Sequence, residues 1–323
     1  IPNPLALVYN ICAILLNCKR IKKKLKQHVL DLAVTKGLLN HFSAGLACKN
    51  LNLPVIWHVQ DLISQRYSGL LNYIFNYMAE KIPDHIICDG KVIRDSLKKV
   101  VRQRATTVLN GIKIDDLSRE KEAGLRTRQE LGIPANAYVI GNMARITPWK
   151  GQELLLNVFT KYAELNQNSY LLLVGSPLFY SDKYFKYLMQ LIDEYGLGKR
   201  VIMPGYRSDL KEIFSAMDIF IYPSLEKDTS PLALLSAISA GLPAIVSNIK
   251  CLEEVVELCS AVDVFDLKNR EGLLSLMAKY EDKDIRDENG NKNRDAGRNN
   301  FDISFHTKNI LECFNTVLSC HNY

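Results

Sequence analysis

Residues 219–247 read IFIYPSLEKDTSPLALLSAISAGLPAIVS, and this stretch decides the fold of the second half of the chain. Two apolar runs, Ile219–Tyr222 and Ala244–Ser247, are typical of buried strands, and an apolar helical segment lies between them. Ser230 and Pro231 stand where the polar loop meets that segment, and this pair predicts the N-cap and first residue of a helix. The stretch therefore predicts a β-α-β unit of a parallel sheet.

The same alternation of short apolar runs and amphipathic segments extends over most of the chain. Predicted strands lie at 32–35, 55–58, 85–88 and 106–109, and then at 138–143, 170–174, 200–203, 219–222, 244–247 and 261–265. Asn110-Gly111, a turn-forming dipeptide, separates the two series. We therefore expect an α/β protein with an N-terminal domain over 1–112 and a C-terminal domain over 113–302, both Rossmann-like and doubly wound. A helix over 303–323 is expected to pack back on the N-terminal domain.

The composition is that of a globular protein large enough for two domains. The chain has 323 residues, of which 47% are hydrophobic and 24% charged. No apolar run reaches the roughly 18–20 residues that span a bilayer. The eight cysteines contain no CxxC pair, which predicts reduced, buried thiols in a cytoplasmic protein. The polar stretch 281–300 predicts an exposed helix and loop.

The net charge of +6 is unevenly placed along the chain. Six lysines and arginines crowd the stretch Lys19 to Lys26, directly after the apolar run 5–16. Such a segment suits peripheral contact with an anionic membrane, here the inner membrane face, or equally a solvated helix face. No aromatic-rich basic surface or zinc-finger spacing points to nucleic acid as a partner.

The loop after the strand at 138–143 carries the first candidate binding residues. It presents Arg145 and Lys150, and a helix is expected to begin near Gln152. Parallel sheets bind ligands at the carboxyl ends of their strands. Two cations beside a helix N-terminus suit a diphosphate, although two surface cations in a loop would leave the same pattern.

Further candidates follow later strands of the same series. Gly175 and the run Gly205-Tyr206-Arg207 each follow a strand, where glycine allows a close backbone approach to a ligand. The loop Asp228 to Leu232, which includes Thr229, enters the next helix. Asp228 could accept hydrogen bonds from sugar hydroxyls, or it could belong to the capping network of that helix.

Taken in order, these motifs resemble those of the retaining, family-four glycosyltransferases of group 1 type, which have the GT-B fold. The resemblance runs from about Asp31 to the end of the chain and is strongest over 139–256. It rests on Arg145 to Lys150, on Gly205-Tyr206-Arg207-x-Asp209, on Pro223-Ser224, and on Leu234-Leu235-x-Ala237-x-x-Ala240-Gly241-Leu242-Pro243. It implies two Rossmann-like domains facing a cleft that holds the nucleotide-sugar.

By this resemblance Arg145 and Lys150 would hold the diphosphate, and the loop Gly205 to Arg207 would border the base. The family usually carries two glutamates seven residues apart, one at the sugar and one at the ribose; here Asp228 and Ser236 stand at those positions. Ser236 keeps a hydroxyl but loses a charge-assisted hydrogen bond, which is typically worth about 1.5–3 kcal/mol. The other residues expected to bind the donor are Gly175, Thr229, Ser230, Pro231 and Leu232.

The first half of the chain departs further from the family. The family often has a histidine near the reacting sugar, and here Gln60 stands at its position, with His58 two residues earlier. Because residues two apart on a strand share a face, His58 could reach the sugar or be a structural histidine. Nothing before Asp31 resembles the family's opening strand and glycine-rich loop, so the N-terminal domain is expected to lack its first β-α units.

The resemblance implies a retaining enzyme that moves a hexose from a nucleotide-sugar to a glycan or lipid-linked acceptor in the synthesis of cell-surface polysaccharide or glycoconjugates. No cofactor and no metal are expected. The alternative is a truncated or degenerate relative that binds nucleotide or acts as a scaffold without transfer. An oxidoreductase is disfavoured because no strand is followed by Gly-x-Gly-x-x-Gly, and a GT-B epimerase is a minor alternative.

Overall fold

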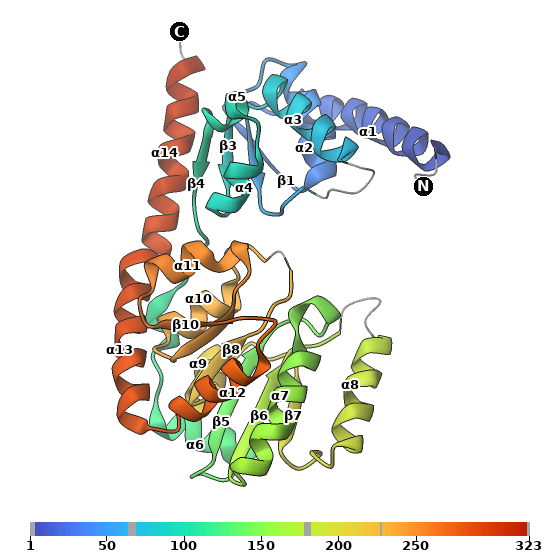
Figure 1. Ribbon diagram of the computed structural model, residues 1–323. Helices are drawn as coiled ribbons and strands as arrows, with labels where there is room; N and C mark the ends of the chain where they lie inside the picture. Colours follow the sequence, from blue (N-terminus) through green and yellow to red (C-terminus); the bar gives the residue numbers. More distant parts are fainter. Residues whose placement is uncertain (1–3, 64–68, 178–181, 227, 322–323) are drawn as a thin grey trace. The chain divides into compact units, whose positions relative to one another are not determined.

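The computed structural model describes residues 4–63, 69–177, 182–226 and 228–321, and the chain divides into two compact units. Unit 1 comprises Ile1–Leu109 and Ser304–Tyr323, and unit 2 comprises Asn110–Ile303. Each unit contains one wholly parallel sheet covered by helices (Figure 1). The α/β class predicted from the sequence is confirmed.

The sheet of unit 1 has four strands in the order β1-β2-β3-β4. They are β1 (Ala33–Lys36), β2 (Val55–Val59), β3 (His85–Cys88) and β4 (Ala105–Thr107). All four lie where the sequence predicts strands, although β4 ends two residues earlier than expected. Because sequence order and spatial order agree, the described strands of this sheet contain no reversal that would mark a ligand crevice.

Helices pack on both faces of the unit 1 sheet. They are α1 (Pro4–Leu25), α2 (Leu38–Lys49), α3 (Leu70–Lys81), α4 (Lys91–Ser96), α5 (Lys99–Arg102) and α14 (Ile303–His321). On one face Trp57 of β2 packs against Phe75 of α3, with ring centroids 5.4 Å apart. On the other face Cys313 of α14 joins the cluster that contains Ile56 and Ile87. Successive side chains of β2 therefore point to opposite faces of the sheet and pack into two separate apolar layers.

The sheet of unit 2 has six strands in the order β10-β9-β8-β5-β6-β7. They are β5 (Tyr138–Met143), β6 (Ser169–Val174), β7 (Val201–Gly205), β8 (Ile219–Tyr222), β9 (Ala244–Ser247) and β10 (Val262–Phe265). Every predicted strand of the second series is present. The strand order reverses between β5 and β8, so the carboxyl ends of these two strands form the switch point at which doubly wound sheets bind ligands.

Helices and short 3-10 turns precede, connect and follow the strands of unit 2. They are η1 (Ile114–Leu117), α6 (Lys121–Glu130), η2 (Pro148–Lys150), α7 (Gln152–Leu165), α8 (Asp182–Glu194), α9 (Leu210–Ala216), α10 (Leu232–Ser239), η3 (Lys250–Leu252), α11 (Glu253–Leu258), α12 (Arg270–Lys279) and α13 (Lys283–Asn300). Apolar side chains of α7, α8 and α12 share one core with the strands, whereas α10 contacts β8 and β9. Helix α7 begins at Gln152, as predicted.

Helix α13 corrects the expectation of an exposed helix and loop over 281–300. The stretch forms one continuous helix, and one face of it is buried against α10 and the turn that follows α10. A Cβ at Gly290 would lie 2.5 Å from the carbonyl oxygen of Gly241, and one at Gly297 would lie 2.7 Å from the Cα of Ser239. The polar composition concealed this contact because its buried face is built from glycines and Asn293 rather than from large apolar side chains.

Two further features concern the whole described chain. All eight cysteines are free thiols, and five of them are buried, namely Cys18, Cys48, Cys88, Cys259 and Cys313. Cys12 and Cys320 are exposed and Cys251 is partly exposed, so the prediction of buried thiols holds for most of them. Of the helices in the described part of the chain, none combines the length and the apolar character needed to cross a membrane.

Candidate functional site

A cavity of about 490 Å³ opens at the switch point of the unit 2 sheet. It collects the carboxyl ends of β5, β6 and β7 and the first two turns of α10. Six residues predicted from the sequence line it, namely Arg145, Gly175, Tyr206, Arg207, Leu232 and Ser236. The three loops that the sequence singled out separately therefore meet in one place.

Arg145 is the exposed cation of this cavity. Its loop continues the pairing of β5 with β6, since the Ala144 N–H donates to Val174 over 3.0 Å and the Ile146 N–H donates to Ser176 over 3.1 Å. The Gln152 side chain donates to the Arg145 carbonyl over 2.8 Å. The Arg145 guanidinium lies 5.5 Å from the Trp149 ring centre. The backbone is thus fixed while the side chain stays open to a ligand.

Lys150 does not line this cavity. Its side chain is only 8% exposed, and its ammonium group pairs with Asp228 and donates to the Tyr222 hydroxyl over 2.6 Å. Burial lowers the pKa of Lys150, and the Asp228 carboxylate opposes that shift. The sequence presented Arg145 and Lys150 as two equivalent loop cations, but the structure gives them different surroundings.

Asp228 is the centre of a small polar cluster. Tyr222 donates its hydroxyl proton to Oδ2 of Asp228, and the Ser224 hydroxyl donates to the same oxygen over 3.3 Å. Burial raises the pKa of Tyr222 well above 10, so the phenol stays protonated and acts as a donor. Sequence reasoning missed Tyr222, whose position as the last residue of β8 was the available signal.

Ser230 does not act as the helix cap that the sequence predicted. Helix α10 starts at Leu232, and no side chain caps it. Ser230 has a φ of +47°, and its hydroxyl accepts a hydrogen bond from the Asn110 N–H over 2.8 Å. The Asn110 amide in turn donates to the Ser230 carbonyl over 2.9 Å. The residue that the sequence predicted as a helix N-cap therefore anchors the loop before α10.

The remaining loop residues lie around these anchors. Pro231 is buried at the cap position of α10, and Thr229 is partly buried between Asp228 and Ser230. Leu232 is 56% exposed at the cavity. Although these residues are neighbours in the sequence, only Leu232, the first residue of α10, lines the cavity; Thr229 and Pro231 do not.

The two glycines of the site differ in what they permit. A Cβ at Gly175 would lie 1.9 Å from the Ala144 carbonyl oxygen, so this glycine allows two loops to meet rather than a ligand to approach. At Gly205 nothing crowds a Cβ, but the φ of +82° favours glycine. The Gly175 N–H donates to the Gly205 carbonyl over 2.9 Å, which holds both strand ends together.

Arg207 and Tyr206 form the far wall of the cavity. The Arg207 guanidinium donates to Asp209 over 2.5 and 2.7 Å and to Glu130 over 2.6 Å. These hydrogen bonds raise the pKa of Arg207 and lower that of Asp209. Tyr206 is 75% exposed and offers an uncovered ring. Asp209 and Glu130 thus hold the Arg207 side chain in place at the wall of the cavity.

Ser236 lines the cavity from the second turn of α10. It is 5% exposed and contributes a hydroxyl but no charge. The described lining contains no carboxylate from α10, so the serine at this position leaves an uncharged inner wall.

His58 lies in unit 1, near the carboxyl end of β2. It is 3% exposed, and its Nε2 is hydrogen-bonded to Oδ1 of Asp89. Gln60 donates to Oδ2 of the same carboxylate over 3.1 Å. Asp89, which sequence reasoning missed, thus gathers the two side chains that share a face of the strand.

The family match of this chain lies within unit 2. Residues 125–297 match the family of glycosyl transferases group 1. The UDP-Gal:alpha-D-GlcNAc-diphosphoundecaprenol alpha-1,3-galactosyltransferase of Escherichia coli is 28% identical over 247 residues, which cover 73% of this chain and 61% of that protein. The O-antigen biosynthesis glycosyltransferase WclY of Escherichia coli is 26% identical over 171 residues, covering 53% and 44%. The chain thus spans less than two thirds of the length of either relative.

Solved structures extend the likeness to both units. Anabaena HepE in complex with UDP and glucose has a TM-score of 0.83 and 20% identity, covering 92% of this chain and 80% of that one. The sucrose-phosphate synthase of Thermosynechococcus elongatus has a TM-score of 0.79 and 17% identity, covering 94% and 77%. These likenesses confirm the predicted GT-B fold with its two Rossmann-like domains.

Proposed function

Because the chain belongs to the glycosyl transferases group 1, we propose that it is a retaining enzyme that transfers a hexose from a nucleotide-diphosphate sugar to a glycan or lipid-linked acceptor. The observation that carries the proposal is the cavity at the switch point of unit 2, where Arg145, Tyr206 and Ser236 converge. The pathway we assign to it is the synthesis of cell-surface polysaccharide or glycoconjugates. A relative named for O-antigen biosynthesis supports this choice.

We assign the donor to the C-terminal domain, residues 113–302, and the acceptor to the N-terminal domain, residues 1–112. The diphosphate binds between Arg145 and the start of α10, where the first backbone N–H groups have no partner in a preceding helical turn. The base packs near Tyr206 and Gly175, and Ser236 meets the ribose. This arrangement places the charged part of the donor at Arg145, an exposed cation of the cavity lining.

The ion pair of Lys150 with Asp228 belongs to the sugar end of this site. All the hydrogen bonds that the described residues make to Asp228 end on Oδ2, so Oδ1 can accept from a sugar hydroxyl. Lys150 contributes positive field near the diphosphate rather than a direct contact. The role of His58 at the reacting sugar stays a prediction, as does the C-terminal helix 303–323 as a separate structural segment.

The proposed mechanism acts on one face of the sugar. The bond between the anomeric carbon and the diphosphate oxygen breaks, the acceptor oxygen forms its bond on the same face, and the departing diphosphate takes the acceptor proton. Arg145 and the α10 terminus stabilise the developing charge on the leaving group, which is an electrostatic role. We propose that this stabilisation comes from protein groups without a metal or other cofactor.

The test is nucleotide binding and sugar transfer by Arg145→Ala. We expect this variant to bind UDP at least about tenfold more weakly and to lose transfer, because a charge-assisted contact to phosphate is removed. Arg298→Ala, an exposed arginine of α13 outside the cavity, is the matched control. Unchanged UDP affinity and turnover in Arg145→Ala would overturn the proposal.

A second candidate is a degenerate relative that binds nucleotide without transfer. Two observations favour it: Ser236 leaves the inner wall uncharged, and Lys150 is already paired with Asp228. Calorimetry with UDP followed by assays of donor hydrolysis and transfer separates the candidates. Binding without either reaction supports the degenerate relative, and turnover supports the enzyme.

We also propose that the protein is cytoplasmic and that its helix α1 makes peripheral contact with the inner face of the membrane. Its exposed side chains include Tyr9, Leu15 and Leu16 followed by Lys19 and Lys23, so apolar and basic groups share the solvent-facing side. Co-sedimentation with anionic vesicles should exceed that with neutral vesicles. Replacing the lysines and arginines of 19–26 by glutamine should abolish the difference; persistence of the difference would contradict the membrane contact.

A further inference from the structure

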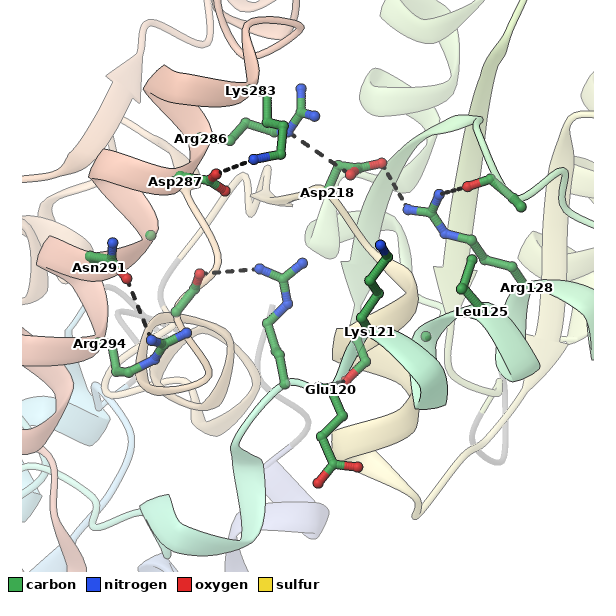
Figure 2. A pocket seen from close by; sticks show the side chains of 16 residues that line it. Glu120, Lys121, Leu125, Arg128, Asp218, Lys283, Arg286, Asp287, Asn291 and Arg294 are labelled. Carbon is green, nitrogen blue, oxygen red and sulfur yellow. Dashed lines mark hydrogen bonds and ion pairs between the residues drawn. The ribbon is translucent and has the colours of Figure 1, made fainter.

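A second, larger cavity lies at the opposite edge of the unit 2 sheet, where the strands begin. It measures about 610 Å³ and includes Ala135 before β5, Asp218 before β8 and Gly241 before β9. Six basic and three acidic side chains line it (Figure 2). The basic ones are Arg119, Lys121, Arg128, Lys283, Arg286 and Arg294. The cavity is therefore a concentration of positive charge on the edge away from the donor site.

Three of the basic side chains are engaged by neighbouring carboxylates. Arg128 donates to Asp218 over 2.9 Å, and Arg286 lies 3.9 Å from the other oxygen of that carboxylate. Lys283 pairs with Asp287 over 2.6 Å. These ion pairs give three of the six basic side chains a structural role. They also engage two of the three acidic side chains, Asp218 and Asp287.

The third acidic group is engaged outside the cavity. Glu120 pairs with Lys211, which lies on α9 and does not line the pocket. The lining carboxylates therefore leave no partner for the remaining cations. Among the residues that the structure describes, no carboxylate lies within ion-pair distance of Arg119, Lys121 or Arg294.

The two unpaired arginines meet at Gly241. Arg119 donates to the Gly241 carbonyl over 3.3 Å and to the Met217 carbonyl over 2.7 Å, while its buried Nε has no partner among the described residues. The Arg294 guanidinium lies beside Gly241, where an added Cβ would lie 2.7 Å from its Nη2, and its Nη1 donates to the Asn291 side chain over 3.4 Å. Both guanidinium groups thus lie against the same backbone residue.

The positive charges of Arg119 and Arg294 repel each other. Burial lowers the pKa of Arg119 to about 10; among the nearby charges Asp218 opposes this shift most, whereas Arg294 and Arg128 add to it. Lys121 adds a third positive charge: Figure 2 shows Lys121 from α6 on the other side of the cavity from Arg294 of α13. An anion in the cavity would relieve the repulsion and satisfy unused guanidinium donors.

We propose that this cavity binds a compact phosphorylated anion carrying at least two phosphate groups, held by Arg119, Lys121 and Arg294. The guanidinium forks suit phosphate oxygens, and a single phosphate group carries only about 1.5–2 negative charges against three unpaired cations. The cations converge on one cavity rather than follow a stripe, which suits a small ligand better than a nucleic acid strand. The site lies on the other edge of the sheet from the donor cavity and does not depend on it.

The test is calorimetric titration of the full chain with inorganic pyrophosphate at low ionic strength. Pyrophosphate could also bind at Arg145, so the titration is made on Arg145→Gln, in which we expect binding to persist. Adding Lys121→Gln and Arg294→Gln should weaken that binding at least about tenfold, which corresponds to about 1.4 kcal/mol. Arg298→Gln, the same change on the exposed side of α13, should leave it unaltered.

Two measurements make the outcome decisive. Far-UV circular dichroism of each variant establishes that it is folded, and a rise in melting temperature with pyrophosphate reports binding independently of transfer. Equal affinity with and without the Lys121 and Arg294 changes, or no binding to Arg145→Gln, would overturn the proposal. Failure of the donor assignment would instead show as unchanged UDP binding in Arg145→Ala.

Discussion

Lys150 and Asp228, 78 residues apart in the sequence, form a nearly buried ion pair that the Tyr222 hydroxyl shares. The pair joins the loop after β5 to the loop after β8, which are the two strands flanking the switch point. Each side chain thereby fixes the other. The same contact explains why Lys150 is withdrawn from the cavity that Arg145 lines.

Breaking this pair should cost more than removing both partners. Lys150→Met leaves the Asp228 carboxylate largely buried without its cation, and we expect a loss of about 3–5 kcal/mol in unfolding free energy. The double variant Lys150→Met with Asp228→Leu should recover much of that loss, because no charge remains buried. Urea denaturation measures both; equal losses in the single and double variants would contradict the pairing.

Restoring a carboxylate on α10 should strengthen nucleotide binding. Ser236→Glu would add a charged acceptor to the inner wall of the cavity, and we expect UDP to bind roughly ten- to a hundredfold more tightly if the ribose lies there. Ser236→Gln provides the matched control of similar size without charge. Calorimetry with UDP compares them, and a Glu variant that binds no better than the Gln variant would argue against the ribose at this position.

Gly151 should be intolerant of a side chain. Its φ is +75°, and a Cβ would lie 2.0 Å from the Pro223 carbonyl oxygen. We expect Gly151→Ala to lower stability by about 3 kcal/mol, from the left-handed backbone and the clash together. Gly132→Ala separates the two causes, because Gly132 has a φ of +68° and nothing within 4 Å. Its loss should stay near 1 kcal/mol; similar losses in both variants would exclude the clash.

Acid should destabilise unit 1 through His41. Burial, and then the nearby His58, lower the pKa of His41 from 6.5 to about 4, so the folded protein holds this ring neutral. The unfolded chain binds the proton more readily, so stability falls as the pH drops from 6.5 towards 4. Each pKa unit corresponds to about 1.4 kcal/mol, which gives a loss of about 3 kcal/mol.

The measurement is urea denaturation of the wild type and His41→Gln between about pH 7 and pH 4. The variant should show a shallower decline over this range. His28→Gln, which changes an exposed histidine, should follow the wild type. Identical pH slopes for the wild type and His41→Gln would mean that His41 does not carry the effect.

The strands were predictable because burial on both faces of a parallel sheet requires continuous apolar runs. Ile219–Tyr222 and Ala244–Ser247 carry that pattern with clear turn signals between them, and both occur with the expected bounds. Helix α13 was less predictable, since its packing against Gly241 uses small residues that carry no apolar signal. Gly290 and Gly297 were the only features of this segment in the sequence that could have indicated the close packing.

For the binding site, the sequence by itself determined the residue types and the strand ends that carry them. Arg145 and Tyr206 were recognisable because each follows a predicted strand, and parallel strands bring such ends to one edge. Ser236 was recognised only through the family resemblance, at the position of the second glutamate. Tertiary structure alone decided which of these groups are available. Lys150 pairs with Asp228, Ser230 binds Asn110, and both contacts join residues too distant in the chain for any local pattern to reveal.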